Sequence, residues 1–177
     1  MDKSEVRKRM RELKRAVPPE EKLRRSALIM ERVEQTEAFR KAKVVLLYWS
    51  MADEVQTHAF VERWYRAKTL LLPCVDGDDL RLRPYTGPDC LVAGEQFGIG
   101  EPTGPEWNDL EAVELIVVPG VAFDKAGHRM GRGRGFYDRL LKSTPRAVKI
   151  GVAYGFQMLD AVPVEPHDVN MNLVIHD

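Results

Sequence analysis

The sequence predicts an α/β fold: a single three-layer α/β/α domain with a mixed, mostly parallel sheet, spanning residues 1–177. Three observations predict it. Short apolar runs typical of buried strands alternate with segments whose apolar residues recur every three or four positions, as in helices. A glycine-rich loop joins one of these runs to a helix, as ligand-binding loops do in such folds. A chain of 177 residues can bury one substantial core, and no second domain is expected.

Two helices are predicted at the start of the chain, at residues 2–16 and from 19 to about 40. Pro18 and Pro19 end the first helix and begin the second. Spacings of four, three and four residues predict that the first helix buries Val6, Met10, Leu13 and Val17. The second is expected to bury Leu23, Ala27, Met30 and Val33.

Strands are predicted at residues 43–48, 69–74, 80–85, 114–119, 147–154 and 173–175. The third alternates apolar and charged residues after a turn, as in a half-exposed antiparallel strand, and the last is expected at an edge. Further helices are predicted at 57–67 and from 136. A rigid turn containing Glu101 is expected at 97–102, and Trp107 should anchor the loop that follows to the core.

The glycine-rich loop, residues 127–139, reads GHRMGRGRGFYDR. Its alternate glycines, Gly131, Gly133 and Gly135, are expected to adopt positive φ and to leave backbone N–H groups open to a ligand. Such a run of amides before a helix binds anions, and arginine side chains suit phosphate oxygens. The arginines are Arg129, Arg132 and Arg134. The loop therefore predicts a phosphate site, although it matches neither of the two common nucleotide-binding fingerprints.

Charged residues elsewhere can meet this loop. Lys3, Arg7 and Arg11 lie four apart on one face of the first helix, although such a face can also be simply solvated. Asp53 and Glu54 follow the first strand, where ligands bind in α/β sheets; Asp53 is expected to cap the next helix and Glu54 to enter the site.

Two more carboxylates, Asp138 and Asp168, are within potential reach of the loop, and Mg²⁺ usually needs only one or two protein carboxylates. Asp138 could instead pair with Arg134 or Arg139. His167, beside Asp168, is a further candidate for the site.

Composition excludes several other classes of protein. Lys and Arg total 27 and Asp and Glu also 27, so no overall charge draws the chain to nucleic acid or a membrane, although its first 25 residues are basic. The two cysteines and four histidines lack metal-ligand spacing, and no serine elbow indicates covalent catalysis. No apolar run is long enough for a membrane span, and the charged start differs from a signal peptide. A cytoplasmic protein is expected.

The glycine-rich loop and its flanks also carry a family resemblance. Residues 118–141, VPGVAFDKAGHRMGRGRGFYDRLL, closely resemble the signature of the 5-formyltetrahydrofolate cyclo-ligase family, also called methenyltetrahydrofolate synthetase. The likeness continues in the basic first helix, in LLYWSMADEVQT at residues 46–57, in FGIGEP at 97–102, and in His167-Asp168. The motifs occur in the same order over nearly the whole chain.

The resemblance implies an ATP- and Mg²⁺-dependent ring closure of 5-formyltetrahydrofolate to 5,10-methenyltetrahydrofolate, with ADP and phosphate released through a phosphorylated formyl intermediate. Carried over by position, the ATP-binding residues would be Lys3, Arg7, Arg129, Met130, Gly131, Arg132, Gly133, Arg134, Gly135, Phe136 and Tyr137. Folate would meet Trp49, Glu54, Phe136 and Tyr137, and Mg²⁺ would meet Asp138 and Asp168. Catalytic contributions are expected from Arg132, Arg134 and Tyr137.

The chain departs from the family at Phe136, where a tyrosine is usual, and at Met130, where leucine is usual. A monomer that binds ATP and folate, and neither nucleic acid nor membrane, is expected. The alternatives are a nucleic-acid-binding module built on the arginine-rich helix and loop, and a sugar-phosphate or coenzyme A-binding protein of the same fold. The latter would not require Glu54 or a metal-binding Asp138.

Overall fold

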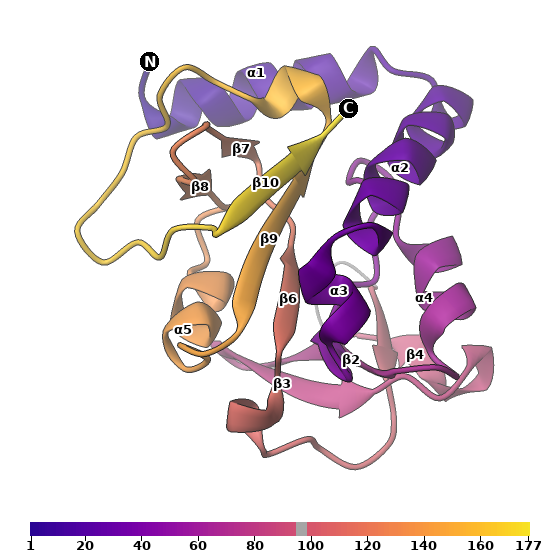
Figure 1. The fold of residues 1–177 in the computed structure, drawn as a ribbon. Coiled ribbons are helices and arrows are strands. Elements are labelled where there is room, and N and C mark those ends of the chain that lie inside the picture. Colours follow the sequence, from indigo (N-terminus) through magenta and orange to yellow (C-terminus); the bar gives the residue numbers. More distant parts are fainter. Residues whose placement is uncertain (95–98) are drawn as a thin grey trace.

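A computed structural model describes residues 1–94 and 99–177, and its centre is a six-stranded sheet (Figure 1). The strands follow the order β10 (Leu173–His176), β9 (Val148–Ala153), β6 (Leu115–Val118), β1 (Val44–Leu46), β2 (Thr69–Asp76) and β3 (Asp79–Pro84). Neighbouring strands from β10 to β2 pair in parallel, and β3 pairs antiparallel with β2 at the edge. The predicted mixed, mostly parallel sheet is confirmed, and β10 is the predicted edge strand.

Helices α2 (Pro19–Glu34), α3 (Glu37–Lys41) and α4 (His58–Trp64) lie on one face of the sheet (Figure 1). The prediction of one helix from 19 to about 40 was wrong, because the chain breaks after α2 and Thr36 caps α3 through the N–H of Phe39. The predicted stripe was half wrong. Leu23 is 60% exposed and Ala27 is exposed, whereas Ser26 is buried because its hydroxyl meets the side chain of Tyr154.

The other face carries the short helix α5 (Phe136–Lys142) and a small hairpin of β7 (Ala122–Phe123) and β8 (Arg129–Met130). We expected β6, the glycine-rich loop and α5 to follow one another directly. The hairpin intervenes, so the first residues of the glycine-rich loop belong to β8. The layer is thinner than the one opposite, and it leaves room beside the hairpin for a site.

Helix α1 (Lys3–Arg15) lies across the end of the molecule, above β7 and β8 (Figure 1). A capping box fixes its start, since Asp2 and Glu5 each accept the backbone N–H of the other. Val6 and Met10 pack on the hairpin, as predicted, in a cluster with Val121, Ala122, Met130 and Val162. The rest of the predicted stripe differs: Lys14 is buried, and Leu13 and Val17 are only half-buried.

The middle of the chain forms a second small sheet, in which β4 (Leu91–Ala93) pairs antiparallel with β5 (Gly100–Pro102). Part of the predicted turn at 97–102 lies outside the described residues, and the rest is extended as β5. The N–H of Trp107 donates to the carbonyl of Leu82, which agrees with its expected anchoring role. Short 3₁₀ helices lie at Pro88–Cys90, Leu110–Ala112 and Gly155–Gln157. Within the described ranges, no helix has the length and apolar character needed to cross a membrane.

Candidate active site

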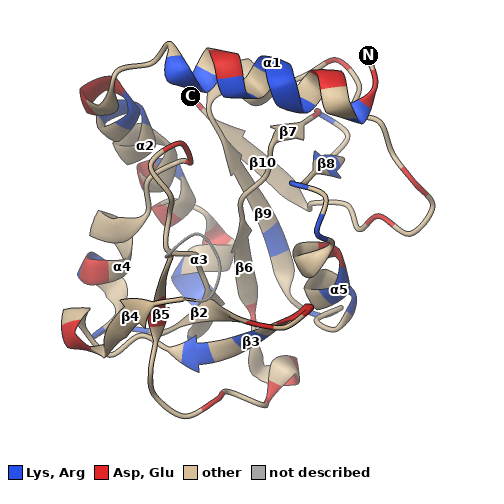
Figure 2. Ribbon diagram, turned by 180° about the vertical axis from the view of Figure 1, so that it is seen from behind, with Lys and Arg blue, Asp and Glu red and all other residues tan. Residues whose placement is uncertain are grey.

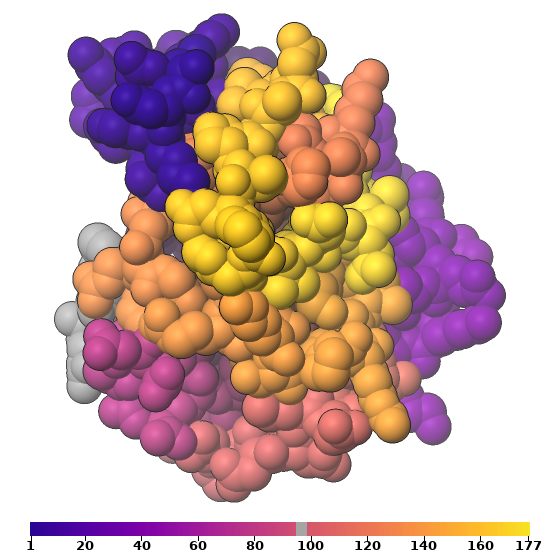
Figure 3. Space-filling model, turned by 90° about the vertical axis from the view of Figure 1, so that its left-hand side faces the viewer, coloured from indigo at the N-terminus to yellow at the C-terminus, as the bar shows by residue number. Residues whose placement is uncertain are grey.

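A cavity of about 710 Å³ opens where β1 and β6 end, beneath α1. Its walls come from distant parts of the chain: α1, residues 48–54, residues 119–121, the glycine-rich loop and residues 165–168. Figure 3 shows the N-terminal end of α1, in indigo, beside the yellow C-terminal part of the chain. Lys and Arg residues of α1 and of the segment between β8 and α5 gather at this end of the molecule (Figure 2).

Of the three alternate glycines in the loop, Gly131, Gly133 and Gly135, two have the conformation that we predicted. Gly133 has φ of 103° and Gly135 has φ of 72°, both in the left-handed region that side chains disfavour. Gly131 is not among the positive-φ glycines, so the prediction for it was wrong. Its lack of a side chain serves packing instead, since a Cβ there would lie 3.0 Å from the guanidinium of Arg129.

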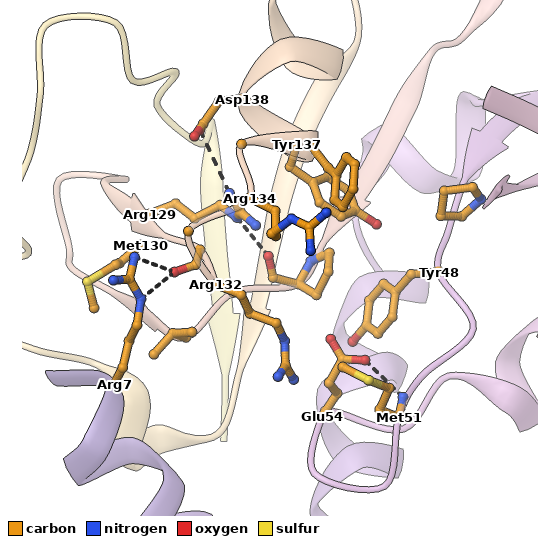
Figure 4. A pocket seen from close by; sticks show the side chains of 18 of the residues that line it. Arg7, Tyr48, Met51, Glu54, Arg129, Met130, Arg132, Arg134, Tyr137 and Asp138 are labelled. Atoms are coloured by element: carbon orange, nitrogen blue, oxygen red, sulfur yellow. Dashed lines mark hydrogen bonds and ion pairs between the residues drawn. The ribbon is translucent and has the colours of Figure 1, made fainter. Parts of the chain in front are cut away.

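Arg7 and Lys3 both border the cavity, and each already has a partner. The Nε and Nη2 atoms of Arg7 donate to the carbonyl oxygen of Gly131 at 3.2 Å, which joins α1 to the glycine-rich loop (Figure 4). Lys3 Nζ donates to Glu165 Oε1 at 2.8 Å, which joins the start of α1 to the 163–168 loop. Arg11 lines the cavity one turn further along. The row of cations on α1 therefore borders the cavity, and Arg11 is also exposed to solvent.

Arg129 is the buried support of the loop. Its Nε donates to the carbonyl of Pro119 at 2.7 Å, and its guanidinium carbon lies 5.1 Å from the centre of the Tyr137 ring. Its Nη1 lies 3.9 Å from Asp138 Oδ1, so Asp138 pairs with Arg129, and not with Arg134 or Arg139 as the alternative would require. Met130 borders the cavity, but its side chain packs into the core under α1.

Arg132 and Arg134 are the exposed arginines of the loop, and both extend into the space facing Tyr48 and Glu54 (Figure 4). The Nη2 of Arg132 donates to Asp53 at 3.3 Å. The expectation that Asp53 caps α4 was therefore wrong: the N-cap is Thr57, without a side-chain capping bond, and the carboxylate of Asp53 is drawn to two cations instead.

Glu54 lines the cavity opposite the glycine-rich loop, as predicted. Its Oε1 accepts the N–H of Met51 at 2.8 Å (Figure 4). Burial raises the pKa of Glu54, which makes the neutral acid easier to form than in water. Buried hydroxyls fix the backbone around it, because Tyr154 donates to the carbonyl of Glu54 and Tyr48 to that of Val55.

Aromatic side chains complete this half of the cavity. Trp49 stacks on His58 with ring centres 3.8 Å apart and planes 9° from parallel. Phe136 and Tyr137 stand at the start of α5 on the side of the glycine-rich loop. Burial raises the pKa of Tyr137, so its phenol stays protonated at neutral pH.

Asp168 lies at the far side of the cavity, in the 163–168 loop. It is 13% exposed, and its Oδ2 accepts the N–H of Glu165 at 2.8 Å. Within the described residues, Glu165, His167 and Asp168 can each offer a ligand atom to one ion, all within 4.8 Å of one another. Asp138 borders the same cavity and is not one of this group.

Sequence reasoning missed several residues that line the site. Glu165 carries no motif of its own, and only its partner Lys3, distant in sequence, reveals it. Tyr48 was predicted only as a residue of a buried strand, and Lys14 was not predicted to have any role in the site. Both line the cavity. For Lys14 the available signal was its spacing of four from Met10, which puts a lysine on the buried face of α1.

The cavity joins a basic, glycine-rich end to an aromatic end that holds the carboxyl group of Glu54. Comparison with known proteins shows to which family a chain with this site belongs. The sequence profile of the 5-formyltetrahydrofolate cyclo-ligase family matches residues 1–177. The chain belongs to this family. The predicted resemblance to this family is therefore confirmed.

Individual relatives agree. The chain is 35% identical over 144 residues to a 5-formyltetrahydrofolate cyclo-ligase of Haemophilus influenzae, covering 73% of each chain. It is 26% identical over 191 residues to the mouse protein of that name, covering 97% of this chain and 92% of the other.

Among solved structures, the 5,10-methenyltetrahydrofolate synthetase of Aquifex aeolicus superposes with a TM-score of 0.88 at 37% identity, covering 99% of this chain and 90% of that one. The synthetase of Mycoplasma pneumoniae superposes with a TM-score of 0.79 at 25% identity, covering 99% and 98%. At 99% coverage, the matched length includes nearly all of the chain that forms the cavity.

Proposed function

We propose that this protein closes the ring of 5-formyltetrahydrofolate to give 5,10-methenyltetrahydrofolate, using ATP and Mg²⁺ and releasing ADP and phosphate. One observation carries the proposal: one cavity is lined by the glycine- and arginine-rich loop on one side and by aromatic side chains and the half-buried carboxyl group of Glu54 on the other. A triphosphate suits the first half, and a flat pterin suits the second. Family membership supports the same reaction.

The chemistry needs both halves of the cavity. The formyl oxygen attacks the γ-phosphorus of ATP, the bond to ADP breaks, and the formyl carbon becomes a phosphorylated iminium. N10 of the folate then bonds to that carbon and loses its proton, and phosphate leaves with the former formyl oxygen. A formyl oxygen on nitrogen is a poor leaving group until it is phosphorylated. Holding the two substrates in contact therefore supplies much of the rate.

At the phosphate end, the glycine-rich loop would supply backbone N–H groups, and Lys3 and Arg7 would add charge from α1. Arg132 and Arg134 are the exposed cations nearest the folate side (Figure 4). We propose that they stabilise the negative charge that develops on ADP and phosphate during the transfer. Electrostatic stabilisation of this kind dominates the catalysis of phosphoryl transfer. Tyr137, with its neutral phenol, would orient the reacting groups.

The residues present fit a magnesium ion. Asp138, in the first turn of α5, and Asp168, in the 163–168 loop, both border the cavity and would offer the carboxylate oxygens that Mg²⁺ prefers, with waters and phosphate oxygens completing its shell. When bound, the ion supplies positive charge to the transferring phosphoryl group. Asp138 is held near Arg129, and Asp168 is fixed by the N–H of Glu165, so both carboxylates are oriented by the chain itself.

At the folate end, Glu54 would accept hydrogen bonds from the amino and N–H groups of the pterin, and Trp49, Phe136 and Tyr137 would contact its ring and the adjoining aromatic ring. The pterin is flat and polar along one edge. An aromatic wall beside the carboxyl group of Glu54 matches both features. We further propose a cytoplasmic, single-domain, monomeric enzyme that binds neither nucleic acid nor membrane.

The test is to mix the protein with ATP, Mg²⁺ and 5-formyltetrahydrofolate and to follow the near-ultraviolet absorbance of the methenyl product. We expect product only when both ATP and Mg²⁺ are present, with one ADP formed for each product molecule. Lys8→Met, an exposed change on α1 away from the cavity, is a matched control and should behave as the wild type. Absence of ATP-dependent product across pH and metal concentration would refute the proposal.

A further inference from the structure

Lys14 is the one lysine of α1 on the helix's buried face. The face comprises Val6, Met10 and Lys14, spaced four apart. Only 6% of the Lys14 side chain is exposed, and the residue lines the cavity. An apolar residue would complete this stripe at less cost, because a buried ammonium loses its hydration.

The ammonium of Lys14 is poorly compensated. In the described part of the chain its nearest carboxylate oxygen is Asp53 Oδ2 at 3.9 Å, which is beyond hydrogen-bond distance. No oxygen atom of the described residues accepts a hydrogen bond from the ammonium. Asp53 is itself shared with Arg132 at 3.3 Å and is 40% exposed. An ammonium has three donors. All three are therefore available to a molecule in the cavity, and burial lowers the pKa of Lys14 accordingly.

The position of Lys14 shows which end of the cavity it borders. Its Nζ lies 3.9 Å from the carboxylate of Asp53, the neighbour of Glu54 in the chain, so Lys14 lies on the side of the cavity that we assign to folate. The pyrimidinone edge of a pterin presents the 4-oxo oxygen next to an N–H and an amino group. A carboxyl group complements the two donors, and a neighbouring cation complements the oxygen.

We propose that Lys14 binds the 4-oxo oxygen of the pterin and, with Glu54, determines specificity for 4-oxo folates. This inference rests on the proposed function. Asp53 then also positions the lysine, because its charge holds the ammonium near the oxygen while leaving the hydrogen bonds of Lys14 to the ligand. The lysine is a substrate-binding residue that lowers the stability of the free protein.

The test replaces Lys14 by methionine, which keeps the stem and removes the charge, and measures equilibrium binding without ATP. The Kd for 5-formyltetrahydrofolate should rise about tenfold to a hundredfold, the effect of losing one hydrogen bond to a charged group. The Kd for ATP should change less than about twofold, and the melting temperature should not fall. Lys8→Met is the matched control, and Lys14→Leu is a second variant for the same measurements.

A pair of ligands separates recognition from a merely structural role. The wild type should bind 5-formyltetrahydrofolate more tightly than its 4-amino analogue, and Lys14→Met should bring the ratio of the two dissociation constants close to one. If Lys14→Met leaves the ratio of the two dissociation constants unchanged, including by weakening the binding of both ligands equally, the inference is overturned even where the wild type performs the reaction. If the wild type neither binds nor converts 5-formyltetrahydrofolate, the proposed function fails instead.

Discussion

Gly133 offers a test of whether the conformation of the glycine-rich loop matters for both folding and nucleotide binding. Its φ of 103° lies in a region that an alanine enters only with strain, which costs about 2 kcal/mol. Space is not the problem, because an added Cβ would lie 3.5 Å from the nearest atom of Arg7, an ordinary contact. Gly133→Ala should therefore lower the free energy of unfolding through its backbone alone.

The magnitude can be measured in two assays. Urea unfolding should show a loss of about 2 kcal/mol, and the melting temperature should fall by about 4 to 8 °C, as expected for a chain of this length. If the strain is relieved by turning the loop, its N–H groups move away from the phosphates. The KM for ATP should then rise about tenfold, with the KM for 5-formyltetrahydrofolate changed less than about twofold.

Two other glycines serve as controls. Gly77 has φ of 62° in the turn between β2 and β3, with open space around it, so Gly77→Ala should cost about 1 kcal/mol and leave the KM for ATP unchanged. Gly104 has neither strain nor neighbours within 4 Å, and Gly104→Ala should change neither quantity. If Gly133→Ala unfolds like Gly104→Ala and keeps the wild-type KM for ATP, the reasoning about the loop is refuted.

Three further predictions concern single side chains. Asp138→Asn should lower kcat at least a hundredfold and shift the Mg²⁺ dependence to higher concentration; wild-type turnover would remove Asp138 from the metal site. Lys3→Ala removes only an exposed ion pair with Glu165, so the free energy of unfolding should change by less than about 1 kcal/mol. The KM for ATP should rise, and an unchanged KM would show that Lys3 does not bind ATP. Glu54→Gln should raise the KM for 5-formyltetrahydrofolate about tenfold or more. Because burial raises the pKa of Glu54 above 4.5, the folded protein retains a proton that the unfolded chain loses, and wild-type stability falls as the pH rises from 4.5 through the raised pKa. The glutamine in Glu54→Gln does not ionise, so the variant should not lose this stability. The free energy of unfolding of the variant minus that of the wild type should therefore increase as the pH rises from 4.5 through the raised pKa, and should be constant below pH 4.5. A difference that stays constant across the whole pH range would contradict the raised pKa.

The sheet was predictable from the sequence because its strands are short, apolar and separated by helical patterns. Leu71 and Val117, for example, are buried and stand in continuous apolar runs, as residues of parallel strands do. The positive φ of Gly133 and Gly135 was predictable for a similar reason, since alternate glycines indicate a backbone conformation that side chains disfavour. These signals are local, so a single sequence contains them.

What could not be predicted depends on contacts between distant residues. Arg7 donates to the carbonyl of Gly131, which is 124 residues away, and nothing near Arg7 indicates it. Sequence reasoning places Asp53 at a helix cap because caps are decided locally, whereas its real partners come from α1 and the glycine-rich loop. The buried face of α2 was misjudged by less than one turn, because Ile29, Met30 and Val33 pack on the sheet together with Ser26 and leave Leu23 facing solvent.

The position of α1 has a consequence for how the protein acquires its site during synthesis. The helix is synthesised before the residues on which it packs, because the hydrophobic cluster beneath it includes Val121, Met130 and Val162. Until those residues are made, Val6 and Met10 have nothing to cover them, and Arg7 has no carbonyl to bind. The cavity therefore closes only after most of the chain has been synthesised, so that nascent fragments are expected to lack the ability to hold nucleotide.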